Sequence, residues 1–188
     1  KATAQNESLG YTEWTLKNGI KVIVRPSTLK ADEVRISAVS KGGKSLLSDA
    51  DLFTGDLLPM VMSQSGISKF SATELAKQLT GKNAYASVGV ADYEHAVNAG
   101  GSPKDIETIL QLVYLNFTSP CFDQTDLDNL KKLYVPYFQN MESDPNYIMG
   151  REFTKTLYNN NARRQITNAA QIEALNIDAL KAVHNKLY

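Results

Sequence analysis

Residues 14–24 read Trp-Thr-Leu-Lys-Asn-Gly-Ile-Lys-Val-Ile-Val, with apolar and polar residues alternating on either side of Asn18-Gly19. Alternation with a period of two is typical of a β-strand. Asn-Gly between two such runs is the strongest short signal for a hairpin, because both turn residues readily adopt positive φ. The segment 12–25 is therefore predicted to be a β-hairpin, and it ends at Pro26 because proline cannot donate a ladder hydrogen bond.

Three further strands are predicted downstream of the hairpin. One covers residues 34–41, where apolar and polar residues again alternate, and it stops at Gly42-Gly43. Two others cover residues 83–90 and 93–99 and are joined near Asp92. The sequence therefore predicts about five strands, and short turns favour antiparallel pairing for the consecutive ones.

Capping residues mark the start of each predicted helix. Ser, Asp or Asn at this position accepts a hydrogen bond from a free backbone amide of the first turn. Ser71-Ala-Thr-Glu74 is a capping box, and Ser102-Pro103 combines a cap with proline at the first helical position. Predicted helices start at Ser48 or Asp49, Ser71, Ser102, Asp123, Asp144 and Asn176, and Gly66 and Gly81 end the first two.

Apolar residues at helical spacing predict which side of each helix faces the core. Pro59 and Pro136 are predicted to kink or delay their helices, because proline removes a backbone hydrogen bond and clashes with the preceding turn. The side chains that mark these apolar sides are Leu52, Leu57, Leu58, Val61 and Met62; Leu75 and Leu79; Ile106, Ile109, Leu110, Val113 and Phe117; Leu127, Leu130, Tyr134, Tyr137 or Phe138, and Met141; Ile148, Phe153 and Leu157; and Ile177, Leu180, Val183 and Leu187.

Strands and helices come in separate blocks along the chain rather than alternating. This order predicts an α+β fold of two layers, a mostly antiparallel sheet of about five strands with helices packed on one face. No repeat and no linker rich in Gly, Ser or Pro divides the sequence. We therefore predict one domain over residues 12–188, preceded by an N-terminal extension over residues 1–11.

The composition excludes several classes of protein. The 188 residues are 43% apolar, and 20 basic residues balance 20 acidic ones, so no net charge attracts nucleic acid or an anionic membrane. A single cysteine, Cys121, excludes an intrachain disulfide and a cysteine-based zinc site. The sequence starts without Met and without a recognisable signal peptide, so we expect a processed product or a piece of a longer protein.

Residue chemistry alone identifies no active site. His95 and His184 are the only histidines; we expect the first on one face of a strand and the second near the C-terminal end of the last helix. Lys41-Gly-Gly-Lys-Ser45 lacks the glycine spacing of a phosphate-binding loop. The carboxylate pairs Asp126/Asp128 and Glu142/Asp144 fit helix caps and solvated faces.

The whole pattern resembles one domain of the pitrilysin/insulinase family of zinc metallopeptidases, the inverzincins, from about residue 12 to the C-terminus. It is most similar to the first domain of the C-terminal half in bacterial four-domain members. The matching stretches are the Leu16–Val22 hairpin of the L-x-N-G-x-x-V type, the Gly-Gly-x-Ser turn at 42–45, Ser65–Ser68, Glu74–Lys82, and Gln111–Pro120 followed by Phe122-Asp123.

The resemblance also implies that this domain lost the metal site. Active members carry H-x-x-E-H on the first long helix, with two zinc ligands and the glutamate that activates water. The corresponding positions here are Asp56, Pro59 and Met60. In the family the third zinc ligand is a glutamate further along the chain, and its place here falls near Val135-Pro136-Tyr137. We therefore expect no catalytic residue, no metal ligand and no cofactor in this chain, and zinc in a sister domain of the parent protein.

The family resemblance implies a role in a substrate chamber. Its active domain binds extended peptides along a strand carrying N-A-x-T, and the matching residues here are Asn83, Ala84, Tyr85, Ala86 and Ser87. Ala86 stands at the Thr position. We expect an outward amide from Tyr85 or Ser87 to contact a peptide, although an ordinary strand without that role also fits the residues.

Expected partners are sister domains of the same polypeptide and an extended peptide, without nucleic acid or membrane. The resemblance favours the periplasm over the cytoplasm. The alternative is a scaffold or partner subunit of a separate peptidase or larger complex, because the same fold without its ligands serves in such assemblies. Both readings give the chain no proteolytic activity of its own.

Overall fold

A computed structural model describes residues 4–188. The chain divides into two compact units, one reaching to Glu33 and one running from Val34 to Tyr188. Our assignment of one domain to residues 12–188 stays a prediction.

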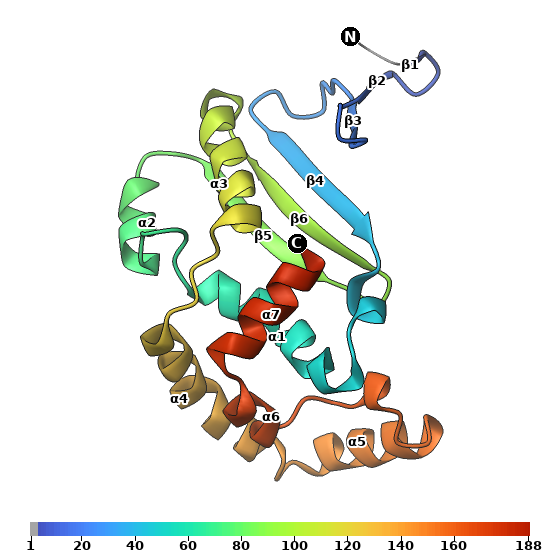
Figure 1. The fold of residues 1–188 in the computed structure, drawn as a ribbon, viewed down its shortest axis with the longest axis vertical. Helices are drawn as coiled ribbons and strands as arrows, with labels where there is room; N and C mark the ends of the chain where they lie inside the picture. The colour runs from blue at the N-terminus through green and yellow to red at the C-terminus, as the bar shows by residue number, and fades with distance from the viewer. Residues whose placement is uncertain (1–3) are drawn as a thin grey trace. The chain divides into compact units, whose positions relative to one another are not determined.

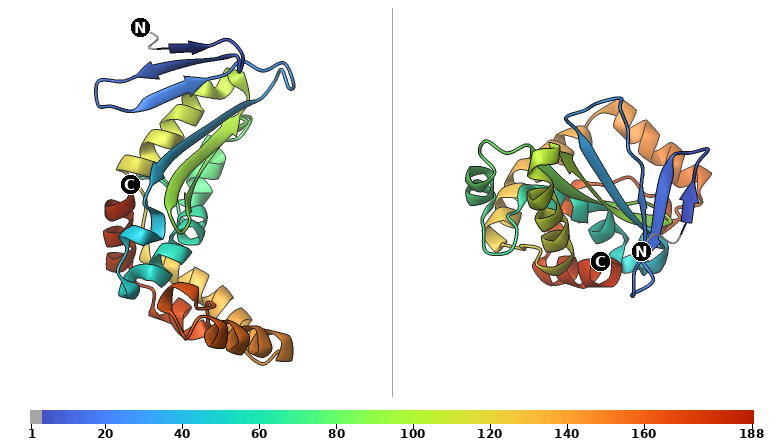
Figure 2. Two further views of the ribbon diagram at one scale, coloured as in Figure 1. Left: turned by 90° about the vertical axis from the view of Figure 1, so that its right-hand side faces the viewer. Right: turned by 90° about the horizontal axis from the view of Figure 1, so that it is seen from above.

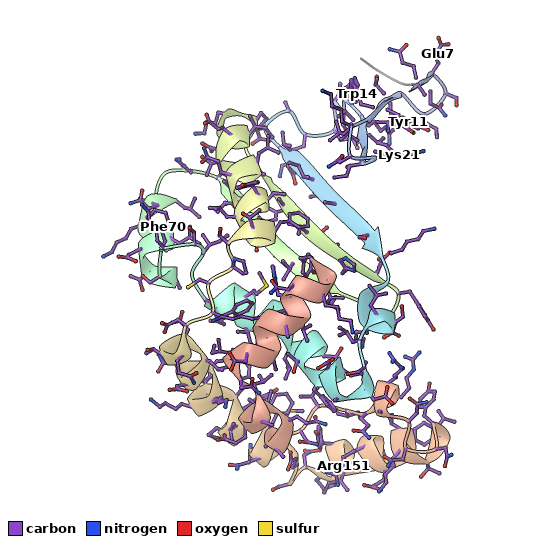
Figure 3. The ribbon with its side chains drawn as sticks, in the orientation of Figure 1. Glu7, Tyr11, Trp14, Lys21, Phe70 and Arg151 are labelled. Carbon is purple, nitrogen blue, oxygen red and sulfur yellow. The ribbon has the colours of Figure 1, made fainter. Side chains whose placement is uncertain are left out.

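The first unit is a small antiparallel sheet with strand order β1-β2-β3. Its strands are β1 (Ala4–Asn6), β2 (Tyr11–Thr15) and β3 (Lys21–Val24), and Trp14 of β2 pairs with Val22 of β3. The predicted hairpin is therefore present, while β1 lies in the stretch that we assigned to an N-terminal extension. Figure 3 labels Tyr11, Trp14 and Lys21 of this unit.

The hairpin turn differs from the predicted one. The Leu16 amide donates to the Ile20 carbonyl (2.8 Å), which leaves a loop of residues 17–19. Gly19 alone adopts positive φ (86°), whereas Asn18 does not. A three-residue loop of this kind needs one residue in the left-handed region, and glycine supplies it without steric cost.

The second unit contains a separate antiparallel sheet with strand order β4-β6-β5. The strands are β4 (Val34–Lys41), β5 (Ala84–Val90) and β6 (Glu94–Gly101), and they are the three predicted strands (Figure 1). The predicted single sheet of about five strands is wrong: the described residues form two sheets of three strands each. Alternation identifies strands but carries no information on which edges share hydrogen bonds.

The second unit also contains the helices. Four short 3₁₀ turns precede or connect them: η1 (Gly43–Leu46), η2 (Asp49–Asp51), η3 (Pro103–Asp105) and η4 (Ala162–Arg164). The α-helices are α1 (Leu52–Gln64), α2 (Ala72–Gln78), α3 (Ile106–Thr118), α4 (Gln124–Met141), α5 (Pro145–Leu157), α6 (Ala169–Ala174) and α7 (Ile177–Leu187).

The predicted caps are present where the first turn is a regular α-helix. Ser71 and Glu74 form the full capping box of α2, and Asp123, Asp144 and Asn176 each accept amide hydrogen bonds at the start of α4, α5 and α7. Helix α6 was not predicted from the sequence. Its capping box, Asn168 with Gln171, was a visible signal, because Asn and Gln fill the same two roles as Ser and Glu.

The core lies where α1, α4, α6 and α7 meet, and α1 and α3 cover one face of strands β5 and β6 (Figures 1 and 2). On that face Val88, Val97 and Ala99 are buried. Leu58, Leu127, Ile172 and Leu180 have no exposed surface. The two-layer α+β arrangement of the prediction therefore holds for this unit.

One predicted apolar side is only partly right, and another is wrong. In α3 Ile109 is buried and Val113 half-buried as predicted, but Ile106, Leu110 and Phe117 are exposed. Leu112 and Asn116 are buried instead. This helix is apolar around most of its circumference, so helical spacing does not determine the buried side. In α5, Ile148, Phe153 and Leu157 are all exposed, and the helix has no buried residue.

The other helices follow the prediction more closely. Leu127 and Leu130 of α4 are buried, and Phe138 rather than Tyr137 packs on the core. Pro59 and Pro136 both lie inside continuous helices, α1 and α4. Helix α1 ends at Gln64. The backbone of Gly66, two residues later, lies so close to Phe70 that a Cβ there would be 1.8 Å from the Phe70 carbonyl oxygen.

Candidate peptide-binding edge and the place of the metal motif

Strand β5 forms one edge of the sheet in the second unit. It pairs with β6 on one side, and no described strand lies on the other. Tyr85 and Ser87 are exposed, Ala84 and Ala86 are half-buried, and Val88 is buried. This alternation places the alanines and the valine on the helix-covered face and the two polar side chains on the opposite face.

The register shows which backbone groups of β5 point away from the sheet. The Ser102 amide donates to the Asn83 carbonyl and the Ala91 amide to the Glu94 carbonyl, both at 2.8 Å. Hydrogen-bonded and non-hydrogen-bonded residue pairs alternate in an antiparallel ladder. The backbone N–H and C=O groups that point toward β6 therefore belong to residues 83, 85, 87, 89 and 91. The outward groups belong to Ala84, Ala86 and Val88, and our expectation of an outward amide at Tyr85 or Ser87 is wrong.

The start of β5 is held by the segment before α3. The Asn83 amide donates to Asp105 Oδ2 at 2.9 Å, and Lys82 Nζ lies 3.0 Å from Thr108 Oγ1. Asn83 precedes the strand, which begins at Ala84. These two bonds tie the start of β5 to the segment before α3 of the same unit, so the position of the first residues of the strand is fixed.

The open face of this sheet is polar and carries small residues. Ser37 of β4 donates to Asn98 of β6 (2.8 Å), and Ser87 is the cross-strand neighbour of Asn98 on β5. The Tyr85 ring lies over Gly100, where a Cβ would come within 2.8 Å of its hydroxyl. Tyr85 therefore leans across β6, and the outer edge of β5 stays clear of its ring.

The positions of the metal motif lie on α1. Asp56, the first of them, forms an ion pair with Lys44 Nζ (2.7 Å), and Pro59 and Met60 have no ligand atom of the family type. Lys44 also pairs with Asp92 (3.1 Å), which contacts Arg164 (3.2 Å). Burial lowers the pKa of Lys44, but the hydrogen bonds and charges of Asp56 and Asp92 outweigh it and raise the pKa overall.

Beside this ion-pair cluster lies an open pocket of about 490 Å³, lined by Lys44, Ser45, Leu52, Asp92, Tyr93, Tyr158, Asn161, Arg163 and Arg164. Its cations are already engaged: Arg163 pairs with Asp49 (3.3 Å) and donates to the carbonyls of Lys44 and Leu47 (2.9 and 3.0 Å). The hydrogen bond and charge of Lys44 lower the pKa of Asp92. Through these ion pairs and hydrogen bonds the cluster links four parts of the unit: η1, α1, the β5–β6 turn and the segment after α5.

The place of the third ligand lies in the middle of α4. Val135 is half-buried against the core, and Tyr137 is exposed. Within residues 4–188, no group of three or more His, Cys, Asp or Glu side chains is arranged to hold a metal ion. The lack of zinc binding stays a prediction from the sequence.

Both histidines lie in the interior. His95 is on β6, as expected for a strand histidine, and its Nδ1 accepts a hydrogen bond from the Gly43 amide (3.2 Å). We expected His184 near the end of a helix, but it is more deeply buried than that position indicated, with 1% of its surface exposed. Its Nε2 forms a hydrogen bond with the Asn116 carbonyl (2.9 Å). Its Nδ1 has no hydrogen-bond partner. Tyr188 contacts both rings.

The remaining chemically notable residues have structural roles. Asp144 caps α5, Glu142 accepts from the Ala169 amide at 2.7 Å, and Asp128 accepts from Gln124 at 2.8 Å. Burial, with the nearby charges of Asp126 and Asp123, raises the pKa of the Cys121 thiol, which disfavours a reactive thiolate. No helix among the described residues has the length and apolarity needed to cross a bilayer.

The sequence matches no family model and no curated protein. Solved structures nevertheless share its fold. A mutant of the ferredoxin protease FusC in complex with Arabidopsis ferredoxin superimposes with a TM-score of 0.81 at 18% identity, covering all of this chain and 21% of that one. The periplasmic protease PqqL from Escherichia coli gives 0.80 at 18% identity, with the same two coverages.

The chain therefore has the fold of a domain of pitrilysin-family (M16) proteases, and it spans about a fifth of the length of these two. A peptidase M16 inactive domain from Pseudomonas fluorescens also shares the fold: the TM-score is 0.74 at 18% identity, over 94% of this chain and 43% of that one. The fold expected from the family resemblance is confirmed.

Proposed function

We propose that this chain is a non-catalytic domain of a zinc metallopeptidase that degrades peptides or unfolded polypeptides, and that it forms part of the substrate chamber. The fold, shared with two proteases and an M16 inactive domain, supports this role. So do the residues Asp56, Pro59 and Met60 at the motif positions. Zinc then belongs to a sister domain, and the periplasm is the proposed compartment, as for PqqL.

The proposed contact with substrate is the outer edge of β5, over Asn83–Ser87. An extended peptide adds to a sheet edge through main-chain hydrogen bonds, so it is bound with little sequence preference. The observation that carries this proposal is the register, which directs the backbone groups of Ala84, Ala86 and Val88 away from β6. On the open face of the sheet Ser87 lies beside this edge, whereas Tyr85 leans across β6 and leaves the edge free of its ring.

Substitution of Ala86 by proline tests the edge directly. An outward amide is the position that an edge strand tolerates in proline form, so Ala86→Pro removes one donor to the peptide and spares the ladder with β6. We expect a fluorescein-labelled, unstructured ten-residue peptide to bind the wild type weakly and Ala86→Pro several-fold more weakly, by fluorescence anisotropy.

The matched control is Ala86→Thr, which keeps the amide and introduces the residue that the family motif has at this position. It should bind the labelled peptide at least as well as the wild type. Thermal unfolding of all three proteins checks that they fold. Equal binding by the folded wild type and Ala86→Pro would mean that this edge is not the peptide contact.

The second candidate function is a scaffold or partner subunit of a separate peptidase or complex. The absent metal motif fits this role equally well. An H-x-x-E-H motif elsewhere in the same polypeptide favours the peptidase domain, whereas a separate peptidase gene nearby favours the partner subunit. Sequencing of the flanking region separates the two.

A further inference from the structure

Helix α5 has its polar side toward the protein and its apolar side toward solvent. The half-buried residues are Tyr147, Gly150, Arg151 and Thr154, at the i, i+3, i+4 and i+7 spacing of one helix face. Met149, Phe153 and Leu157 follow one another at intervals of four and are 67%, 66% and 60% exposed. We call these three residues the α5 stripe.

The helix is held by polar contacts rather than by apolar packing. The Tyr147 hydroxyl donates to the Thr167 carbonyl, and Asp144 caps the first turn. A polar groove of about 320 Å³ lies beside it, lined by Arg151 and Thr154 of α5 and by Arg164 and Asn168 from the segment that follows. Figure 3 labels Arg151 on this helix.

A helix with this pattern lacks the usual source of stability. Most helices in proteins are stabilised by packing of their apolar face, and short isolated helices are marginal in water. Contiguous exposed apolar residues mark an interaction surface. In the described chain α5 has no buried residue. No described segment therefore covers the apolar side chains of the α5 stripe.

We propose that the α5 stripe is the docking surface for another domain of the same polypeptide; this inference rests on the proposed function. The solved neighbours support a tethered partner, because this fold accounts for only 21% of FusC and PqqL and 43% of the chain with the inactive domain. A linked domain is present at high effective concentration, so a small surface is enough to hold it.

A free partner is a poorer fit to the size of the surface. A stable interface between separate proteins uses about 20–30 residues from each side. The stripe offers three large side chains on one helix. Interfaces between domains of one chain are commonly smaller and need not hold two free molecules together.

Hydrogen–deuterium exchange in the full polypeptide and in the 188-residue chain tests the proposal. We expect the amides of residues 145–157 to exchange at least about tenfold more slowly in the full polypeptide, because a covered helix opens less often. The double variant Met149→Ser/Phe153→Ser should remove that protection. Glu152→Ser, on the same helix but outside the stripe, controls for the loss of helix propensity and should keep it.

Equal exchange of residues 145–157 in the two proteins, or protection that survives the double variant, overturns the proposal. A parent polypeptide without a further domain does so as well. Protection already present in the 188-residue chain assigns the stripe to another segment of the chain or, if it depends on concentration, to a second copy. Binding of the labelled peptide by the double variant should equal wild type, which keeps this test separate from that of the β5 edge.

Discussion

At the scale of the residue, the neighbours of His95 favour its neutral form. The Gly43 amide donates to Nδ1, so a proton on that nitrogen would face another donor. Burial lowers the pKa of His95, and a hydrogen bond to the Leu187 carbonyl opposes this only in part. Gly43 is equally constrained, because a Cβ there would lie 2.2 Å from the Ala91 carbonyl oxygen.

His95 should therefore make the fold sensitive to mild acid. A histidine whose pKa is lowered by folding contributes stability that is fully present above its unfolded pKa of about 6.5 and is lost as the pH falls toward the folded value. We expect wild type to lose more stability than His95→Gln between pH 7.5 and pH 5. Urea unfolding at both values measures this, and His184, present in both proteins, cancels; an equal loss would contradict the prediction.

At the same scale, the two glycines before Lys44 have a structural explanation. Gly42 and Gly43 both adopt positive φ (126° and 53°), as a tight turn requires. The turn brings Lys44 between two carboxylates, Asp56 and Asp92. Its glycines thus serve the path of the backbone next to β6, and the lysine has no free charge to offer a ligand.

At the scale of the element, α7 joins the helices to the sheet. Leu180, Val183 and Leu187 are buried along one side, as the sequence predicted. At its end the Tyr188 hydroxyl donates to the carbonyls of Gly89 (2.8 Å) and Ala96 (3.2 Å). Burial raises the pKa of this phenol to about 12.

Removal of α7 should therefore unfold the second unit, although the helix stands at the end of the sequence. Each fully buried aliphatic side chain contributes about 1.5–3 kcal/mol, and a whole domain is stable by only about 5–15 kcal/mol. Deletion of residues 176–188 should abolish cooperative thermal unfolding. A melting temperature within a degree or two of wild type would show that α7 is not part of this core.

A single substitution gives a milder version of the same test. Leu180 has no exposed surface, and replacing such a leucine by alanine costs about 2–5 kcal/mol. Leu180→Ala should lower the melting temperature by about 4–20 °C for a unit of this size. The neighbouring Lys181 is exposed, so Lys181→Ala should change stability by at most about 0.5 kcal/mol.

At the scale of the whole molecule, the chain has the fold of a protease domain but lacks the residues of the metal motif. A catalytic zinc site needs three protein ligands and an open position. Asp56 is the one carboxylate at the motif positions, and it is engaged with Lys44. The sheet and helices of this chain pack without any of the motif's ligands, so the fold itself does not require them.

The purified chain should accordingly bind well under one equivalent of zinc and hydrolyse no peptide. Metal analysis after dialysis against micromolar zinc measures the first, and a fluorogenic peptide assay the second. One tightly bound zinc per chain would contradict this prediction and would require ligands outside the family motif. The parent polypeptide, assayed in parallel, gives the positive control if a sister domain carries the metal.

The sequence by itself determined the features that depend on near neighbours. The capping box at Ser71–Glu74 and the caps at Asp123, Asp144 and Asn176 are local hydrogen bonds, so the helix starts follow from a few adjacent residues. Strands β2 to β6 were located by the alternation of apolar and polar residues, which is likewise a pattern of adjacent residues. The loss of the motif at residues 56, 59 and 60 is visible without any structure.

Only the tertiary structure decided what depends on distant parts of the chain. Helix α3 is apolar on several sides and α5 has its apolar side outward, so the buried side of each is chosen by the surfaces that meet it. The division into two sheets and the outward amide of Ala86 follow from pairing between segments. Spacing along the chain does not encode these features, because they are properties of contacts between residues far apart in the sequence.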